Sequence, residues 1–231
     1  MTDTLQFFDT AADGLDHEIS LFSRQTSHVA IWTCRKEALV CPAAYARKPG
    51  FSDAADASLR RGWPVTLRRT GGGLVPLGPD VMNICLTFSR TNRFSIQDGY
   101  EALTRVLRNG LGAAGPLLET GATPGSFCDG DWNLSIHGRK LVGTAQRRRP
   151  LGHGNVRILA HALILIQGDT RPSALAVDAL HQDLGLDRIN TTAHTTLAES
   201  MGVPAFDSID VAEQLTVAAS RELAPPSNPI G

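Results

Sequence analysis

The sequence predicts an α+β fold with mixed, largely antiparallel β-sheets flanked by helices. Residues 83–88 place Ile84, Leu86 and Phe88 on one face, as in a strand with one buried side. Residues 96–109 carry apolar side chains at helical spacing, and residues 158–166 are continuously apolar, as in a buried central strand. Strands and helices do not alternate strictly along the chain, which favours α+β over α/β.

The other elements of the first half follow from periodicity and from helix-breaking residues. Leu15, Ile19 and Phe22 predict a helix over residues 10–23, and an alanine-rich segment predicts another at 53–61 that ends before Gly62. The predicted strands are residues 29–33, 38–41 and 65–67. Prolines and glycine at Pro76, Gly78 and Pro79 predict an irregular loop before the strand at 83–88.

In the second half, Ser95 and Asp98 form a capping-box pattern for the helix at 96–109, and Gly110 is expected to close it. Residues 112–125 are expected to form a long loop. A β-hairpin is predicted from 132–136 through a turn to 140–142, followed by a loop that holds the arginines 147–149. Two further helices are expected at 174–184 and 209–223, the second capped by Ser208.

Composition points to a soluble globular protein. The 231 residues have a formal net charge of -1, which gives no argument for nucleic acid as a partner. No apolar run could span a membrane, and the N-terminus lacks the pattern of a signal peptide, so we expect a cytoplasmic protein. The four cysteines have no paired spacing, which disfavours a zinc site or a disulfide framework. We expect one domain over residues 1–231, with 225–231 as a disordered tail.

The first candidate site is a glycine-rich turn between two predicted strands. Three glycines follow two arginines and a threonine: Arg68, Arg69, Thr70, Gly71, Gly72 and Gly73. Glycines allow positive φ and close approach to a ligand, and their bare N–H groups can bind an anion. The arginines add charge suited to carboxylate or phosphate. The alternative is a flexible turn beside two solvated arginines.

The second candidate site lies about seventy residues later, around Lys140. Lys140 follows a tight turn, and Gly143 lets the backbone approach another group closely, with Thr144 and Ala145 next. We expect Lys140 on the solvent side of the hairpin, so that Lys140→Ala would change stability by under about 0.5 kcal/mol. The alternative is an ordinary surface lysine. His161, within the apolar run, is expected to be a hydrogen-bonded core histidine.

Taken together, the two stretches resemble motifs of the biotin/lipoate protein ligase family, in its lipoate branch. The glycine turn, with Asn83 ten residues on, is similar to the family's R-R-x-G-G-G loop, and residues 138–145 are similar to its G-R/K-K-I-x-G-S-A segment. The resemblance implies a mixed sheet that forms a tunnel for lipoic acid. It also implies that Lys140 lies at the acyl carboxylate and that residues 71–73 cover the acyl chain.

The resemblance implies an enzyme that attaches lipoate or octanoate to a lysine of a lipoyl-carrier domain. In the ligase form, ATP with Mg²⁺ activates the carboxylate as an acyl-adenylate, and the protein itself holds no metal. Lys140 would neutralise charge on the carboxylate and phosphate, and the glycine-loop N–H groups would hold the ligand. Ligases of this branch often carry a C-terminal accessory domain, which is not expected here, and the sequence leaves open the need for a separate accessory subunit.

A related branch, the octanoyl-transferases, uses a cysteine shortly before the same lysine, and Cys128 lies near that place. A nearby ammonium lowers a thiol's pKa, and the thiolate can carry an acyl group as a thioester without a nucleotide. The spacing to Lys140 is a few residues short, and Asp129 and Asp131 oppose thiolate formation. On the residues alone we expect Cys128 to be structural and the ligase mechanism to hold.

Three departures from the family pattern support a further alternative. Leu77 stands where the family usually has histidine, and His161-Ala162-Leu163 stands where it has H-G-T or H-G-S. Before the lysine, ligases carry R-N-D, whereas this chain has Asp131-Trp132-Asn133. A chain without these polar groups could be a non-catalytic protein of the same fold that binds the lipoyl carrier.

Overall fold

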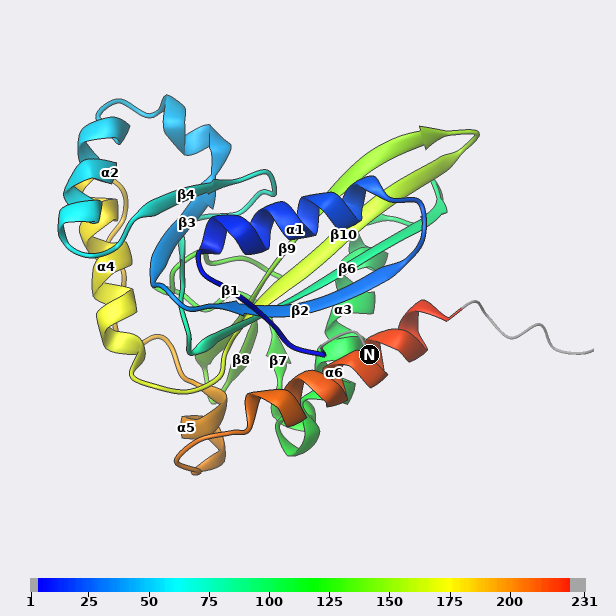
Figure 1. The fold of residues 1–231 in the computed structure, drawn as a ribbon. Helices are drawn as coiled ribbons and strands as arrows, with labels where there is room; N and C mark the ends of the chain where they lie inside the picture. The colour runs from blue at the N-terminus through cyan, green and yellow to red at the C-terminus, as the bar shows by residue number, and fades with distance from the viewer. Residues whose placement is uncertain (1–3, 225–231) are drawn as a thin grey trace, which may run out of the picture.

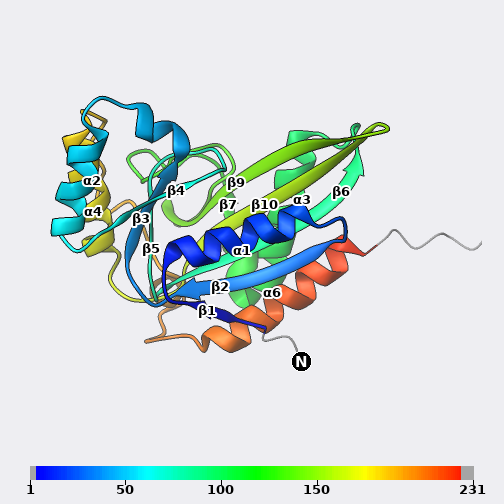
Figure 2. The same ribbon diagram turned by 45° about the horizontal axis from the view of Figure 1, so that its top comes forward.

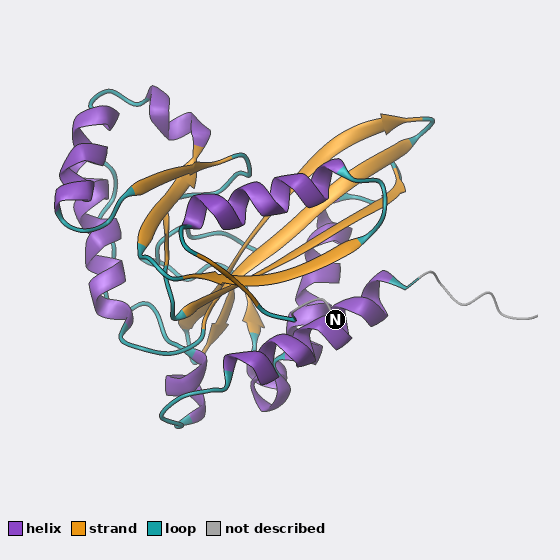
Figure 3. Ribbon diagram, in the orientation of Figure 1, coloured by secondary structure: helices purple, strands orange, loops and turns teal. Residues whose placement is uncertain are grey.

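The computed structural model describes residues 4–224 and consists of two β-sheets with helices around them (Figures 1 and 3). The larger sheet has seven strands in the order β1-β2-β6-β10-β9-β8-β7 and is antiparallel apart from the β1–β2 pair. The smaller sheet has the order β4-β3-β5. The predicted α+β class and the mixed, largely antiparallel pairing are therefore confirmed.

The strands of the larger sheet are β1 (Gln6–Phe8), β2 (His28–Cys34), β6 (Val81–Thr91), β7 (Glu119–Thr120), β8 (Leu134–Ile136), β9 (Arg139–Gly152) and β10 (Asn155–Leu165). The smaller sheet contains β3 (Ala38–Pro42), β4 (Val65–Arg68) and β5 (Val75–Leu77). The helices are α1 (Ala11–Ser23), α2 (Phe51–Arg60), α3 (Ile96–Gly110), α4 (Thr170–Asp183), α5 (Leu197–Met201) and α6 (Ser208–Leu223). Short 3-10 helices span Ala43–Arg47 and Gly112–Leu117.

Helices cover both faces of the larger sheet. α1 packs across one face against β2, β6 and β10, while α3 and α6 pack together on the other. α2 and α4 lie side by side at the smaller sheet (Figures 1 and 2). The paired ends of β9 and β10 extend beyond α1 as a projecting hairpin (Figure 2). The two sheets and α1 thus meet around one region, and the candidate residues gather there.

α1 is capped at its start and bonded to the sheet at its end. Thr10 and Asp13 form a capping box at its start, with the Asp13 N–H donating to Thr10 Oγ1 over 3.3 Å. At its end, the buried guanidinium of Arg157 in β10 donates to the carbonyls of Leu21 and Phe22. A cation at the carbonyl end of a helix is favoured by the helix dipole.

Several local predictions were wrong. The loop expected at Pro76 is strand β5, because proline is tolerated in an edge strand, where its missing N–H is not needed. The arginines 147–149 lie in strand β9 rather than in a loop. The loop at 112–125 contains a 3-10 helix and β7.

Two helix ends also differ from their predictions. Gly110 is the last residue of α3 rather than the residue beyond it, and its Cα lies where an added Cβ would be 2.8 Å from Leu215 of α6. Asp207 rather than Ser208 caps α6, by accepting the N–H of Ile209 over 2.8 Å. The capping box of α3, from Ser95 to Asp98, is confirmed. The expected tail at 225–231 lies outside the described residues, and within those described no helix is long and apolar enough to cross a membrane.

Candidate active site

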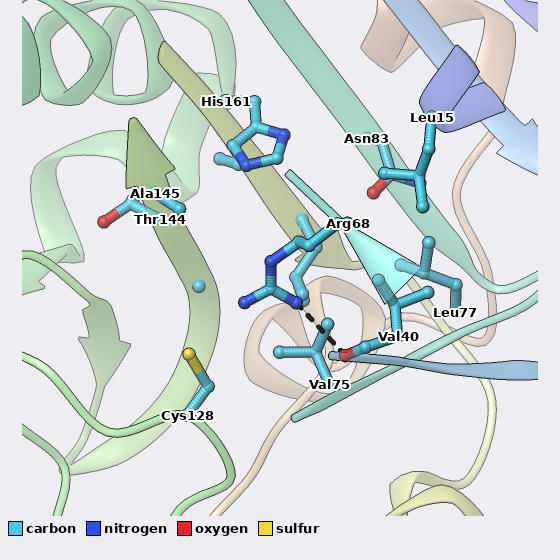
Figure 4. A pocket seen from close by; sticks show the side chains of 13 residues that line it. Leu15, Val40, Arg68, Val75, Leu77, Asn83, Cys128, Thr144, Ala145 and His161 are labelled. Carbon is cyan, nitrogen blue, oxygen red and sulfur yellow. Dashed lines mark hydrogen bonds between the residues drawn. The ribbon is translucent and has the colours of Figure 1, made fainter. Parts of the chain in front are cut away.

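A narrow pocket opens where α1 and the two sheets meet, and Figure 4 shows the side chains that line it. Its walls are Leu15, Val40, Arg68, Val75, Leu77, Asn83, Cys128, Gly143, Thr144, Ala145, His161, Ala162 and Leu163. Most of these side chains are apolar, and Arg68, Cys128 and His161 supply polar groups of different chemistry. The cavity measures about 40 Å³, which is small beside the roughly 300 Å³ of a small ligand pocket.

The structure brings together most of the residues predicted from sequence. Arg68, Asn83, Gly143, Thr144 and Ala145 line the pocket, and Cys128 joins them from the loop before β8. Arg69 is exposed and does not line the pocket. Thr70 is buried behind the loop, and its hydroxyl has no hydrogen-bond partner among the residues described. Lys140 lies beneath the pocket rather than in its wall.

Arg68 organises the glycine turn. Its buried guanidinium donates to the carbonyls of Val40, Gly71 and Gly73, over 3.1, 2.9 and 2.7 Å. Burial lowers the pKa of Arg68, and its interaction with Cys128 acts in the opposite direction. The side chain therefore closes the turn on itself, and its charge interacts with Cys128.

The glycines bring the turn against Cys128. The N–H of Gly73 donates to Cys128 Sγ over 2.9 Å. Gly72 has a positive φ of 98°, and a Cβ on it would lie 2.9 Å from the Arg68 guanidinium and 3.0 Å from Cys128 Sγ. The predicted need for positive φ and close approach is confirmed at Gly72, whereas a Cβ on Gly71 would meet no atom within 4 Å. The group that the glycine turn approaches closely is the thiol of Cys128.

Cys128 is the least buried of the four cysteines. Cys34, Cys41 and Cys85 are buried, and burial raises the pKa of Cys34 and of Cys41 to about 11. Cys128 is half-buried in the pocket wall, with a left-handed φ of 48°. A non-glycine residue in this region is uncommon and is held there by its surroundings. Its sulfur, rather than that of another cysteine, is therefore presented to the pocket.

Lys140 holds the backbone at Cys128. It is fully buried, and its ammonium donates to the carbonyls of Phe127 and Cys128 over 2.6 and 2.8 Å. Burial lowers the pKa of Lys140 to about 8, although Cys128 and Asp129 act in the opposite direction. The expectation that Lys140 faces solvent was wrong, because Phe127 and the segment at His194 cover it. The small stability effect expected for Lys140→Ala assumed a solvent-facing lysine, and that assumption does not hold for this buried side chain.

Asn133 adds a second support to the same loop. Its amide nitrogen donates to the Cys128 carbonyl over 2.9 Å, and its amide oxygen accepts the Thr144 N–H over 3.2 Å. The Thr144 hydroxyl in turn donates to the Trp132 carbonyl over 2.8 Å. The Cys128 loop is thus tied to the β9 segment that lines the pocket.

His194 is a site residue that sequence reasoning missed. Its Nε2 accepts the N–H of Phe127 over 3.0 Å, and its ring stacks on Phe127 with centroids 4.0 Å apart. The backbone carbonyl of Ala193 accepts the N–H of Lys140, which brings the segment beside the hairpin. Burial, together with the charges of Lys140 and Arg139, lowers the pKa of His194 to about 3. No sequence motif marks this histidine, since only the fold brings it to residue 127.

The stability of the fold should depend on pH through His194. The folded pKa of about 3 is below the ordinary 6.5, so the unfolded chain binds the extra proton and stability falls as pH drops below 6.5. Between pH 7 and pH 5 we expect the parent to lose about 2 kcal/mol more than His194→Gln, which keeps a hydrogen-bond acceptor. Urea unfolding at both pH values measures this difference. Equal losses in the two proteins would contradict the assignment.

A buried carboxylate supports the opposite end of the pocket. Glu18 of α1 accepts the indole N–H of Trp32 over 3.0 Å and pairs with His161 Nδ1 over 2.8 Å. With Nδ1 directed at this carboxylate, Nε2 of a neutral His161 is left as an acceptor. The prediction that His161 is hydrogen-bonded is confirmed, and its ring also lines the pocket (Figure 4). Among the residues described, no group of three His, Cys, Asp or Glu side chains could hold a metal ion.

Comparison with known proteins agrees with this geometry. Residues 46–218 match the model of the lipoyl protein ligase A/B catalytic domain. The chain is also 32% identical over 165 residues to the octanoyl-[GcvH]:protein N-octanoyltransferase of Kyrpidia tusciae, covering 69% of this chain and 56% of that protein. The chain spans about half the length of such curated relatives. The protein belongs to the lipoyl protein ligase A/B catalytic domain family, and the resemblance read from its motifs is confirmed.

Solved structures support the same fold. Lipoate-protein ligase A bound with ATP has a TM-score of 0.69 at 15% identity, over 95% of this chain and 83% of that one. The bi-partite lipoate protein ligase of Thermoplasma acidophilum, studied with its E2 lipoyl domain, has a TM-score of 0.64 at 16% identity, over 95% and 82%. At these identities the similarity is one of fold. The biotin/lipoate ligase-like catalytic fold expected from the sequence is confirmed.

Proposed function

We propose that this protein transfers an octanoyl or lipoyl group from one carrier protein to a lysine of another, through a thioester on Cys128 and without ATP. The observation that carries the proposal is the position of Cys128 Sγ, in the wall of an apolar pocket and 2.9 Å from the Gly73 N–H. The names of the relatives, octanoyl-[GcvH]:protein N-octanoyltransferase, support an acylated carrier as donor and a protein as acceptor.

The reaction takes two steps that mirror each other. The Cys128 sulfur attacks the acyl carbonyl of the donor, a thioester bond forms, the acyl–nitrogen bond breaks, and the donor lysine leaves as an amine after taking up the thiol proton. The acceptor lysine amine then attacks the thioester carbonyl, an amide forms and the carbon–sulfur bond breaks. The released Cys128 sulfur takes up the proton that the attacking amine loses. Splitting one transfer into two steps is the general advantage of a covalent nucleophile. No bond is formed to a nucleotide.

The backbone around Cys128 suits this chemistry. The Lys140 ammonium, Asn133 and His194 together hold residues 127 and 128, so the sulfur keeps one position relative to the pocket. Holding a nucleophile close to its target geometry can supply several kcal/mol of the barrier reduction. The Gly73 N–H lies 2.9 Å from the sulfur, in a position to donate to the oxygen of the acyl group when the sulfur is acylated.

The departures from the family motif suit an acyl chain. Leu77, Ala162 and Leu163, which favoured a non-catalytic protein on sequence grounds, line the pocket with apolar surface. An alkyl chain gains about 0.8 kcal/mol for each methylene buried against such a wall. Their apolar character therefore supports acyl binding as well as it supports loss of activity.

The ligase mechanism, our first choice from sequence, has less support. It requires free cations at the acyl carboxylate and the nucleotide phosphates. The Lys140 ammonium is engaged by two backbone carbonyls and the Arg68 guanidinium by three, while Arg69 lies outside the pocket. In this arrangement these residues do not fit ATP.

The test uses an octanoylated GcvH protein as donor and an apo E2 lipoyl domain as acceptor, with and without ATP and Mg²⁺. We expect the acceptor to gain one octanoyl group at the same rate in both conditions, as measured by intact mass. When free octanoate replaces the octanoylated GcvH protein, we expect the enzyme to leave the acceptor unmodified, both with and without ATP. Modification only with free octanoate and ATP, together with pyrophosphate release, would favour the ligase. No modification under any condition would favour the non-catalytic alternative.

A further inference from the structure

The projecting end of the larger sheet concentrates positive charge. We call residues 88–94 and 147–157 the arm, in which the end of the β9–β10 hairpin projects beyond α1 (Figure 2). The arm contains no aspartate or glutamate, and its arginines are Arg90, Arg93, Arg147, Arg148, Arg149 and Arg157. The whole chain has a net charge of -1, so the remainder carries -7 (-1 minus +6). Within residues 4–224, none of the six forms an ion pair with a carboxylate.

Two of the arginines attach the arm to the ends of neighbouring helices. The buried Arg157 binds carbonyls at the end of α1, and Arg148 donates to the Ser95 carbonyl over 2.6 Å at the start of α3. Burial and then the charge of Arg149 lower the pKa of Arg157, so these cations repel one another. The carboxylate of Asp98, on the helix packed against the arm, accepts the Ser95 N–H over 2.6 Å and interacts with the charge of Arg148 without forming an ion pair. Within residues 4–224, the positive charge of the arm is therefore not neutralised by ion pairs.

Two other arginines of the arm, Arg147 and Arg149, pack against the ring of Phe22. The guanidinium carbons of Arg147 and Arg149 lie 5.7 and 5.1 Å from the ring centroid of Phe22. A guanidinium over an aromatic face is attracted to it, and this restricts the long side chain. Side chains that are already ordered lose less entropy when they bind a partner. Arg147 is half-buried, Arg149 is exposed, and both retain donors that the structure does not use.

These two arginines lie on the pocket side of the sheet. Ala145 lines the pocket, and Arg147 and Arg149 follow it by two and four residues along β9, so all three point to the same face. At a rise of about 3.3 Å per residue, they lie roughly 7 and 13 Å from Ala145 along the strand. A protein interface of about 800 Å² per partner is roughly 30 Å across and would cover both the pocket mouth and these charges.

We propose that the arm docks the carrier protein, through acidic side chains that the carrier presents near its modified lysine. This inference rests on the proposed function, in which two carriers must in turn bring a lysine to Cys128. The charge distribution favours a compact acidic face over a nucleic acid, because an extended polyanion would be repelled by the -7 of the remaining chain. Complementary charge speeds encounter and orients a partner, and salt weakens it.

The experiment compares Arg147→Glu/Arg149→Glu with a matched control, Arg60→Glu/Arg171→Glu. The control reverses two exposed arginines on α2 and α4 that form no ion pair in the described chain, so the net charge changes equally. Steady-state transfer from octanoylated GcvH to an E2 lipoyl domain is measured from low to high salt. Acylation of Cys128 by a neutral small thioester, S-octanoyl-N-acetylcysteamine, is measured alongside it.

For the arm variant we expect KM for both carriers to rise at least about tenfold at low salt, approaching the parent value above about 0.5 M salt as charges are screened. Its acylation by the small thioester should stay within about twofold of the parent, and the control should match the parent throughout. An unchanged KM, an equal rise in the control, or tighter binding of the parent to single-stranded DNA than to the carriers would overturn the docking proposal. If the parent is not acylated by the small thioester, the proposed function itself fails.

Discussion

Replacing Cys128 with serine is expected to abolish acyl transfer, by at least about 1000-fold in kcat, while the protein stays folded. Serine keeps the shape of the side chain but is a far weaker nucleophile than a thiolate. Because Cys128 is only half-buried, the free energy of unfolding should change by less than about 1 kcal/mol. Urea unfolding and the carrier-to-carrier assay measure the two quantities on the same preparation.

The other cysteines provide the control for this variant. Cys34 is buried, with a raised pKa, and lies outside the pocket wall, so Cys34→Ala should keep transfer close to the parent rate once folded. A Cys128→Ser protein that transfers octanoate at the parent rate would return Cys128 to the structural role that its spacing from Lys140 first indicated.

Replacing Lys140 with methionine is expected to lower kcat by about 100-fold or more, with a smaller change in KM. Methionine fills a similar volume but cannot donate to the carbonyls of Phe127 and Cys128, so the sulfur loses its fixed position. Lys140→Arg is the matched control for charge: its bulkier guanidinium should not fit the fully buried site and should not restore the rate. A methionine variant with parent activity would show that the ammonium is dispensable.

The pH dependence of the free energy of unfolding measures what the buried Lys140 ammonium does to stability, separately from its effect on kcat. The folded pKa of Lys140, about 8, is below its ordinary 10.5, so the unfolded chain binds more protons between these values. The parent should therefore gain stability relative to Lys140→Met as pH rises from 8 to 9.5, by about 1.6 kcal/mol. The raised pKa values of Cys34 and Cys41 affect both proteins equally and cancel in the difference. A constant difference across this range would contradict the burial of a titrating lysine.

The elements that sequence predicted well are those with local determinants. The capping box at Ser95 and Asp98 and the periodicity that follows it define α3 within one turn, because both signals lie inside the helix. The apolar run at 158–166 marked β10 for the same reason. By contrast, β5 contains a proline and forms only because β3 lies beside it. The length of β9 depends on its partner β10, so the arginines 147–149 could not be assigned to a strand from their own sequence.

The candidate site shows the same division. Motif similarity identified the glycine turn, Lys140 and the position of Cys128, since each is encoded in a short stretch. The burial of Lys140 depends on residues 193–196, more than fifty positions later, and His194 has no local signal at all. The pairing of Glu18 with His161 joins α1 to β10 across 143 residues. Such contacts arise from the fold, and only the three-dimensional arrangement reveals which polar groups remain free to act on a ligand.

The central claim is that Cys128 carries the acyl group, and one measurement tests it most directly. The parent protein is mixed with octanoylated GcvH in the absence of acceptor and nucleotide, quenched in acid and analysed by intact mass and peptide mapping. We predict one added octanoyl group on the peptide that contains Cys128, released by neutral hydroxylamine and absent in Cys128→Ser. An unmodified parent protein that nevertheless delivers octanoate to an added lipoyl domain would contradict the claim.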